Sequence, residues 1–301
     1  MDWKEKNQYA KRQHYVPQFS IRPFETEKGK CLVVKLNTME IIEKLTQDIL
    51  QEIDLYEVKN EYGEYINRNE IEDSYKIFED YVDRSMKHFV DIMSKDDFQK
   101  TYTSMIKGKK NTQWATMEAK LLLHLIITLI RSPKVKELFY NSNFPEFMKP
   151  IIYRQMTVGK MKAVELSKGL LQGQELELAL HFLKDEKRSG LEILTKHIME
   201  GYRLRIFRVS GEERLYLSDE PIIIQKFSDA DYMLPVSPKL CIGAVKIKLN
   251  GEMIQIDSKV YNLTDEEIRE INYSSVQNAS NIVIVQRKED LENIKNLMDK
   301  I

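Results

Sequence analysis

The sequence predicts a single α+β domain over residues 1–301, with a central helical layer flanked by β segments from both ends of the chain. Apolar residues recur at helical spacing through residues 67–201. Short β-like segments lie on either side, after an N-terminal loop in residues 1–66 and among hairpins and helices in residues 202–301. No repeat, low-complexity segment or linker divides the chain, and the two β regions are compatible with one shared sheet.

Composition identifies a folded globular protein. The chain has 301 residues, of which 42% are hydrophobic and 31% charged, enough for a sizeable core. The 46 basic and 47 acidic side chains give a net charge of −1, so nothing attracts the whole molecule to nucleic acid, although a local patch could bind it.

The expected location is the cytoplasm, without a membrane partner. The two cysteines, Cys31 and Cys241, have no metal-binding spacing and suit a reducing compartment. Residues 1–6 lack the apolar core of a signal peptide. The longest apolar run, Leu121 to Ile130, has ten residues, about half a membrane span, which indicates a buried helix.

The N-terminal part begins with an unusual segment, His14 to Phe24. Pro17 and Pro23 make it poor as helix or strand, so we expect it to be ordered by tertiary contacts, with Phe19 and Phe24 as buried anchors. Two strands should follow, Cys31 to Leu36 and Met39 to Leu45, with a turn at Asn37-Thr38 between them.

The middle of the chain predicts six or seven helices. A long helix starts near Asn69, and a second from about Thr112 to Arg131 should be the central core element. Ser132-Pro133 places an N-cap and a first-turn proline before a helix that runs through Tyr140. Pro145 starts a further helix, and two or three more fill residues 158–201.

After residue 202 the pattern returns to strands. We expect one hairpin from Tyr202 to Ile224 around a turn at Gly211-Glu212-Glu213, and a second around Asn250-Gly251. Thr264 to Glu267 is a capping box that opens a helix to about Ala279. A strand from Asn281 to Gln286 and a helix from Glu289 complete the prediction.

Common catalytic motifs are absent. The sequence has no GxGxxG, Walker A, HExxH or GxSxG pattern and no zinc-type cysteine pairing, so it carries no nucleotide-cofactor motif. The five histidines do not cluster, and His124, in the most apolar helix, is best interpreted as a core residue.

Three places point to chemistry beyond a plain core. Glu72 and Glu79 lie on one side of the first long helix, two turns apart, where they could hold a divalent cation or share acid–base work. The alternative is that both reach solvent or pair with lysines. Arg131 ends the core helix, where a cation is also favoured by the helix dipole. Two acids and a proline interrupt the strand pattern within residues 215–221. Sheets use breaks of this kind to aim a side chain into a site.

These motifs together resemble one family, the domain of unknown function 4238. The resemblance covers the whole chain and rests on the following stretches: His14-Tyr15-Val16-Pro17-Gln18-Phe19 with Arg22 and Phe24, Ile71-Glu72 with Glu79, Arg131-Ser132-Pro133, Ser218-Asp219-Glu220-Pro221, Leu234 to Pro238, and Asn278-Ala279. Two departures are visible: Ser132 stands where the family favours threonine, and Glu220 where it favours asparagine, which adds a charge beside Asp219.

The resemblance implies one convergent set of polar side chains drawn from the start, middle and end of the chain. Because buried polar groups must be paired, we expect them to form a single network. The set assigns catalysis to His14, Arg131 and Asp219, binding to Gln18, Arg22 and Ser218, and a metal, magnesium or manganese, to Glu72 and Glu79. The alternative is that the network only locks the N-terminal segment onto the core.

Two function classes follow from this inventory. The first is an intracellular hydrolase, most plausibly a nuclease that cleaves phosphodiesters of a nucleic-acid partner, acting as a toxin or antiviral effector. The second is a non-enzymatic module that binds a nucleotide or a partner protein. The enzyme hypothesis expects Glu72, Glu79 and Asp219 around one cation, whereas the binding hypothesis expects exposed arginines and carboxylates that arginines already hold.

Overall fold

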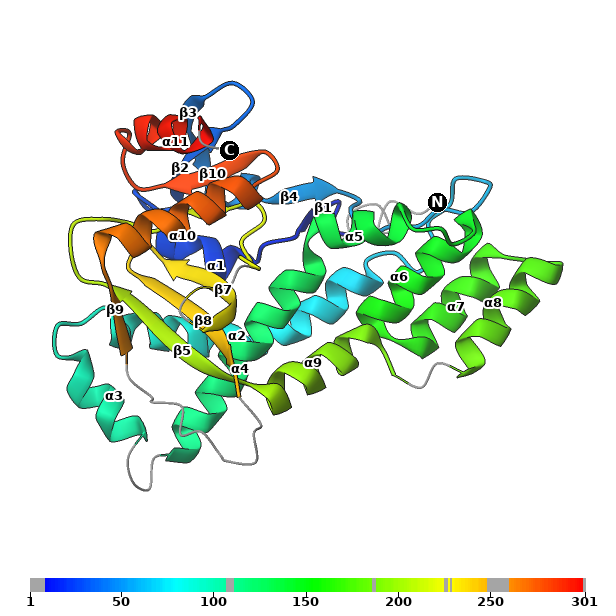
Figure 1. Cartoon of the computed structure of the whole chain (residues 1–301). Helices are drawn as coiled ribbons and strands as arrows, with labels where there is room; N and C mark the ends of the chain where they lie inside the picture. Colours follow the sequence, from blue (N-terminus) through cyan, green and yellow to red (C-terminus); the bar gives the residue numbers. More distant parts are fainter. Residues whose placement is uncertain are drawn as a thin grey trace.

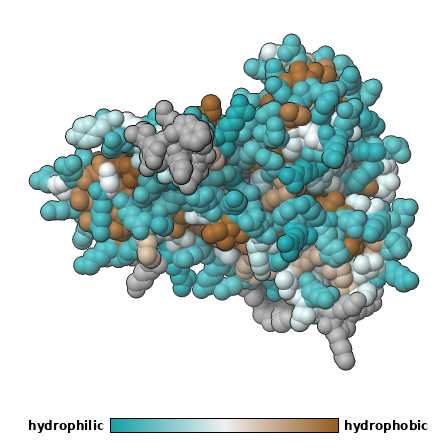
Figure 2. All heavy atoms as spheres, turned by 180° about the vertical axis from the view of Figure 1, so that it is seen from behind, coloured by the Kyte–Doolittle hydropathy of each residue, from teal (hydrophilic) through white to brown (hydrophobic). Residues whose placement is uncertain are grey.

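The computed structural model confirms a mixed α+β architecture (Figure 1). It describes residues 9–106, 111–185, 188–224, 227, 229–247 and 260–299. The strands and the two C-terminal helices gather at one end of the molecule, and a group of helices extends from the other. The face seen from behind is mostly hydrophilic, with apolar residues in small separate groups (Figure 2).

The first sheet joins the two ends of the chain. It has the order β3-β2-β10-β6 and is antiparallel throughout. Its strands are β2 (Lys30–Lys35), β3 (Glu40–Leu45), β6 (Leu217–Ser218) and β10 (Ile282–Val285). The helices α10 (Asp265–Asn278) and α11 (Asp290–Met298) bury their apolar residues, such as Val276 and Ile294, in one cluster with Val34 and Val283 of this sheet. The capping box predicted at Thr264 is confirmed.

The second sheet has the order β7-β8-β5-β9 and comes from the C-terminal part alone. Its strands are β5 (Tyr202–Val209), β7 (Ala230–Ser237), β8 (Leu240–Lys246) and β9 (Val260–Leu263), and only β5 and β9 pair in parallel.

The prediction of a hairpin from Tyr202 to Ile224 is wrong. β5 pairs with β8 and β9, and the segment after the turn pairs instead with β10 through Leu217 and Ser218. The reason lies in burial, because Leu215 and Leu217 belong to two different core clusters and carry the chain from one sheet to the other. The hairpin predicted around Asn250-Gly251 lies outside the described residues.

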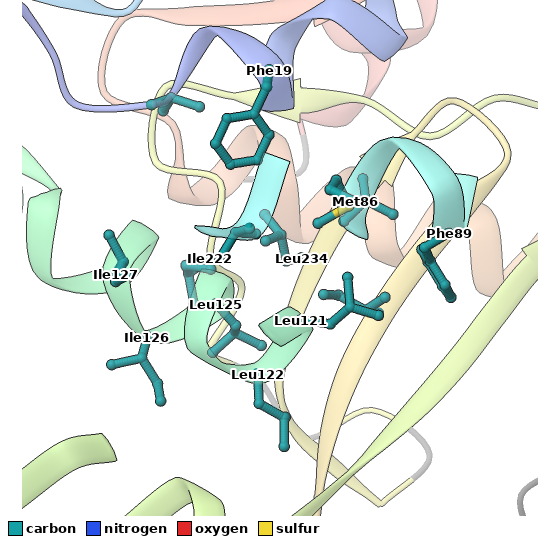
Figure 3. Close-up of a cluster of buried hydrophobic side chains, with 14 of the residues drawn as sticks. Phe19, Met86, Phe89, Leu121, Leu122, Leu125, Ile126, Ile127, Ile222 and Leu234 are labelled. Carbon is teal, nitrogen blue, oxygen red and sulfur yellow. The ribbon is translucent and has the colours of Figure 1, made fainter. Parts of the chain in front are cut away.

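The helical layer is built around α4, as predicted. It consists of α2 (Glu70–Met93), α3 (Phe98–Ile106), α4 (Asn111–Arg131), α5 (Pro133–Tyr140), α6 (Lys149–Val158), α7 (Lys160–Leu170), α8 (Gly173–Asp185) and α9 (Gly190–Gly201), with a 3₁₀ turn η5 (Glu146–Met148) before α6. Leu121, Leu122 and Leu125 of α4 lie with Met86 and Phe89 of α2 in the main core (Figure 3).

The length and composition of α4 would suffice for a membrane span between Thr112 and Arg131, but 56% of that window is buried inside the protein. A soluble core helix passes the same test, and the packing seen in Figure 3 accounts for its apolar residues.

The N-terminal segment is more regular than predicted. It contains β1 (Arg12–His14), α1 (Gln18–Ile21) and the 3₁₀ turn η2 (Arg22–Phe24); a further 3₁₀ turn, η3 (Thr46–Asp48), precedes β4 (Gln51–Ile53), which pairs with β1. Both prolines stand where helices begin, Pro17 as the N-cap of α1 and Pro23 in the first turn of η2, so neither interrupts a helix. Phe19 and Phe24 are buried, as predicted.

Candidate functional site

A half-open cavity of about 300 Å³ lies between the N-terminal segment and α2. Its walls are almost entirely polar, with Phe19 as the one aromatic contribution. The lining residues are His14, Gln18, Phe19, Arg22, Glu72, Lys76, Glu79, Asp80 and Asp83. Five of the eight residues predicted for the site therefore meet here: His14, Gln18, Arg22, Glu72 and Glu79.

Local structure explains this convergence. β1 ends at His14, and α1 begins at Gln18, which places Arg22 one helical turn further along the same wall. The opposite wall is one face of α2, where Glu72, Lys76 and Glu79 follow each other at intervals of four and three residues.

Arg131 lies behind the cavity and is fully buried, with 0% of its surface exposed. Its guanidinium donates to Oε1 of Glu79, to Oε2 of Glu72 at 3.2 Å, and to the backbone carbonyl of His14. The same group stacks over Tyr75, with 4.7 Å from the guanidinium carbon to the ring centroid. One cation thus fastens the N-terminal segment and two carboxylates of α2 to the end of the core helix.

The residues do not form a ready site for the expected magnesium or manganese. A divalent cation requires several free oxygen ligands, yet Arg131 already donates to one oxygen of Glu72 and one of Glu79. Within the part of the chain that the structure describes, no group of three or more His, Cys, Asp or Glu side chains could hold a metal. We therefore derive no chemical step through a metal.

Two protonatable groups that line the cavity, Glu72 and His14, have shifted pKa values. Burial raises the pKa of Glu72 to about 7, against the opposing effect of Arg131 and with a further increase from Glu79. Burial and the Arg131 charge lower the pKa of His14, against smaller opposing contributions from the Gln47 backbone and Asp48. At neutral pH, Glu72 is therefore available in both protonation states beside a largely neutral imidazole.

The stability of the fold should fall with rising pH because of Glu72. Its folded-state pKa of about 7 lies above the ordinary value of 4.5, so its contribution is fully present below about pH 4.5 and is lost as pH rises through about 7. Each pH unit in this window should cost at most about 1.4 kcal/mol. Urea unfolding at several pH values should show this decline in the wild type and its loss in Glu72→Gln. Asp96→Asn, at an exposed position after α2, should keep the wild-type slope; parallel curves for all three proteins would contradict the assignment.

The cationic side chains of the cavity have fewer ion-pair partners than its carboxylates do. Arg131 holds Glu72 and Glu79, and Lys87 holds Asp83 at 2.8 Å. The side chains of Gln18, Arg22 and Lys76 line the cavity, and no hydrogen bond or ion pair joins them to another described residue. The cavity thus offers two cations and an amide for an incoming ligand, and Asp80 is the one carboxylate there left without an ion pair among the described residues.

Asp219 and Ser218 are not brought into this cavity. Asp219 is 2% exposed and accepts from three backbone N–H groups, those of Ser280 at 2.8 Å, Asn281 at 2.7 Å and Ile282 at 3.2 Å. Ser218 donates to the carbonyl of Glu220 at 2.7 Å. The Asp219 carboxylate thus holds the backbone at the start of β10, and the Ser218 hydroxyl binds the backbone two residues further on. The structure therefore places Asp219 and Ser218 outside the cavity, and the catalytic role predicted for Asp219 and the binding role predicted for Ser218 stay predictions.

Glu220 belongs to the same brace. Its carboxylate accepts from the hydroxyl of Ser132, at the start of α5, and its carbonyl accepts from the side chain of Asn278 at 2.7 Å. The two positions at which the sequence departs from the family pattern, Ser132 and Glu220, therefore contact each other directly. The polar set predicted as one network forms two: a cavity at α2 and a brace at β6 and β10.

Sequence reasoning missed Lys76, Asp80 and Asp83 as lining residues. Their signal was available, because they continue at helical spacing the stripe that Glu72 and Glu79 define.

The fold and the cavity define the class: a mixed α+β protein with a polar, half-open site between its N-terminal segment and its longest helix. The chain belongs to the DUF4238 family, whose model, described as a protein of unknown function, matches residues 12–289. Comparison with curated proteins and with solved structures finds no match to the chain.

Proposed function

We propose that this protein is a hydrolase that cleaves phosphodiester bonds, a nuclease, and that the cavity beside α2 is its active site. The supporting observation is the meeting of His14, Glu72 and Arg22 in one half-open cavity. Phosphodiester cleavage needs a group that removes a proton, a group that returns one to the leaving oxygen, and a cation for the phosphate.

The protonation states suggest which group does which. His14, a neutral imidazole, is the general base, and its Nε2 is buried without a hydrogen-bond partner among the described residues, so a ligand or a water could pair with it. Glu72, with a pKa of about 7, carries a proton often enough at neutral pH to act as the general acid. Arg22 binds a non-bridging phosphate oxygen, and Arg131, out of reach behind the wall, positions Glu72.

Two substitutions test this assignment with little damage to the fold. His14→Ala retains the backbone carbonyl that accepts from Arg131, and Glu72→Gln retains an oxygen for the same guanidinium. Each should reduce cleavage of a labelled nucleic acid by at least about 100-fold, the lower end for a lost proton-transfer group. A control variant, His88→Ala, changes an exposed position of α2, the helix that carries Glu72, and should cleave at the wild-type rate. If both site variants keep full activity, the cavity is not the active site.

The binding module is the second candidate, because one observation favours it: a buried arginine pairs with Glu72 and Glu79, while the Arg22 side chain has no ion pair among the residues that the structure describes. On this hypothesis the same cavity binds a nucleotide or a partner protein without turnover. The discriminating result is tight nucleotide binding, measured by calorimetry, by a wild-type protein that cleaves neither RNA nor DNA, with or without magnesium or manganese.

We further propose that the protein acts in the cytoplasm, as a toxin or an antiviral effector. Both cysteines, Cys31 and Cys241, are free and buried, which fits a reducing compartment. A nuclease there has access to the nucleic acids of the cell and of an invader alike.

A further inference from the structure

Among the described residues that line the cavity, no side chain carries a hydroxyl or a thiol that could attack phosphorus to form a covalent intermediate. The lining residues are carboxylates, basic groups, an amide and a phenyl ring. Ser20, next in sequence to Phe19, is buried with its hydroxyl 3.1 Å from Nε2 of His124, and Tyr15 and Tyr75, next to His14 and Lys76, are buried as well. Since His14 and Glu72 are assigned to proton transfer, we take the nucleophile to be a water molecule or a hydroxyl of the substrate.

The ion pairs of the carboxylates favour a hydroxyl of the substrate as the nucleophile. Hydrolysis of a phosphodiester by water is commonly driven by metal ions that generate hydroxide and clamp both oxygens. Here Glu72 and Glu79 each give an oxygen to Arg131, which reduces what they can offer to such ions. A hydroxyl built into the substrate needs less activation, because a well-oriented intramolecular group reacts at an effective concentration of about 10⁵–10⁸ M.

We infer that the substrate is single-stranded RNA and that its own 2′-hydroxyl is the nucleophile, an inference that rests on the proposed nuclease function. RNA differs from DNA by this hydroxyl, and unpaired strands allow it to line up with the neighbouring phosphate. The largely buried Phe19 contributes an apolar contact to the same cavity, while Arg22 and Lys76 supply cations for the backbone.

The step balances without any further reagent. The proton of the 2′-hydroxyl passes to His14, the 2′-oxygen forms a bond to phosphorus, and the bond from phosphorus to the 5′-oxygen breaks. Glu72 gives its proton to the departing 5′-oxygen. The products are a strand with a 2′,3′-cyclic phosphate and a strand with a 5′-hydroxyl, and a proton exchange between the two side chains through solvent restores the starting state.

The test compares four labelled strands of one sequence with the full-length protein in excess EDTA: RNA, DNA, DNA with one ribonucleotide, and RNA with 2′-O-methyl groups throughout. RNA should be cut, and the mixed strand should be cut only after its single ribonucleotide. DNA and 2′-O-methyl RNA should react at least about 100-fold more slowly. Mass spectrometry of the fragments should find the cyclic phosphate and the 5′-hydroxyl.

The outcomes separate this inference from the proposed function. Cleavage of DNA at a rate close to that of RNA, cleavage that needs added metal, or fragments with 5′-phosphates would overturn the 2′-hydroxyl mechanism and leave a nuclease. Absence of cleavage of all strands by folded protein, with and without metal, would overturn both. Arg22→Ala should raise KM for RNA with a smaller effect on kcat, and Arg84→Ala, at an exposed position of α2, should change neither.

Discussion

Arg131→Met is expected to lower the free energy of unfolding by about 3–5 kcal/mol, the range for removing one partner of a buried ion pair. The methionine preserves most of the apolar stem but leaves Glu72, Glu79 and the carbonyl of His14 without their common donor. Urea unfolding at pH 7 measures the loss. Because the same donor fastens the N-terminal segment, the protein should also become more sensitive to proteases near residue 14.

A matched control comes from Arg84, an exposed arginine on the cavity helix α2. Arg84→Met should change the free energy of unfolding by less than about 0.5 kcal/mol, as is usual for a surface position. If Arg131→Met is as mild as this control, Arg131 does not join the N-terminal segment to the core.

Asp219→Ala is expected to destabilise the protein by about 2–4 kcal/mol, because three backbone donors near β10 lose a charged acceptor. Asp219→Asn, which keeps one accepting oxygen, should lose less. Thermal and urea unfolding measure both, and Asp96→Ala, at an exposed position, serves as the control.

The second readout of Asp219→Ala is activity per folded molecule, which should match the wild type at temperatures where the variant is folded. The sequence alone assigned this residue to catalysis. A folded Asp219→Ala protein without activity would return the residue to the active site and contradict the bracing role.

Helical periodicity accounts for what could be predicted of the site. Glu72 and Glu79 share one face of α2 because seven residues make almost two turns, and that geometry is local. The burial of Phe19 and Phe24 agrees with the general preference of large apolar side chains for the interior. The mixed α+β class could be predicted because the spacing of apolar residues changes from a helical to a strand-like period along the sequence.

Long-range pairing could not be predicted in the same way. The turn at Gly211 is compatible with a hairpin, and nothing nearby reveals that Leu217 and Ser218 will pair with β10. The same limit applies to Asp219, since an acid in a strand break can aim into a site or hold a neighbouring loop. Only the position of Ser280 and Asn281 decides between these roles.

The first sheet also has a consequence for how the protein is made. β2 is an early strand, but one of its neighbours is β10, and the side chain of Gln286 donates to the carbonyl of Phe24 across 262 positions of sequence. During translation β2 and Phe24 therefore lack these partners until residues 282–286 have left the ribosome. The first sheet is therefore completed only near the end of synthesis, and until then one edge of β2 lacks its partner strand.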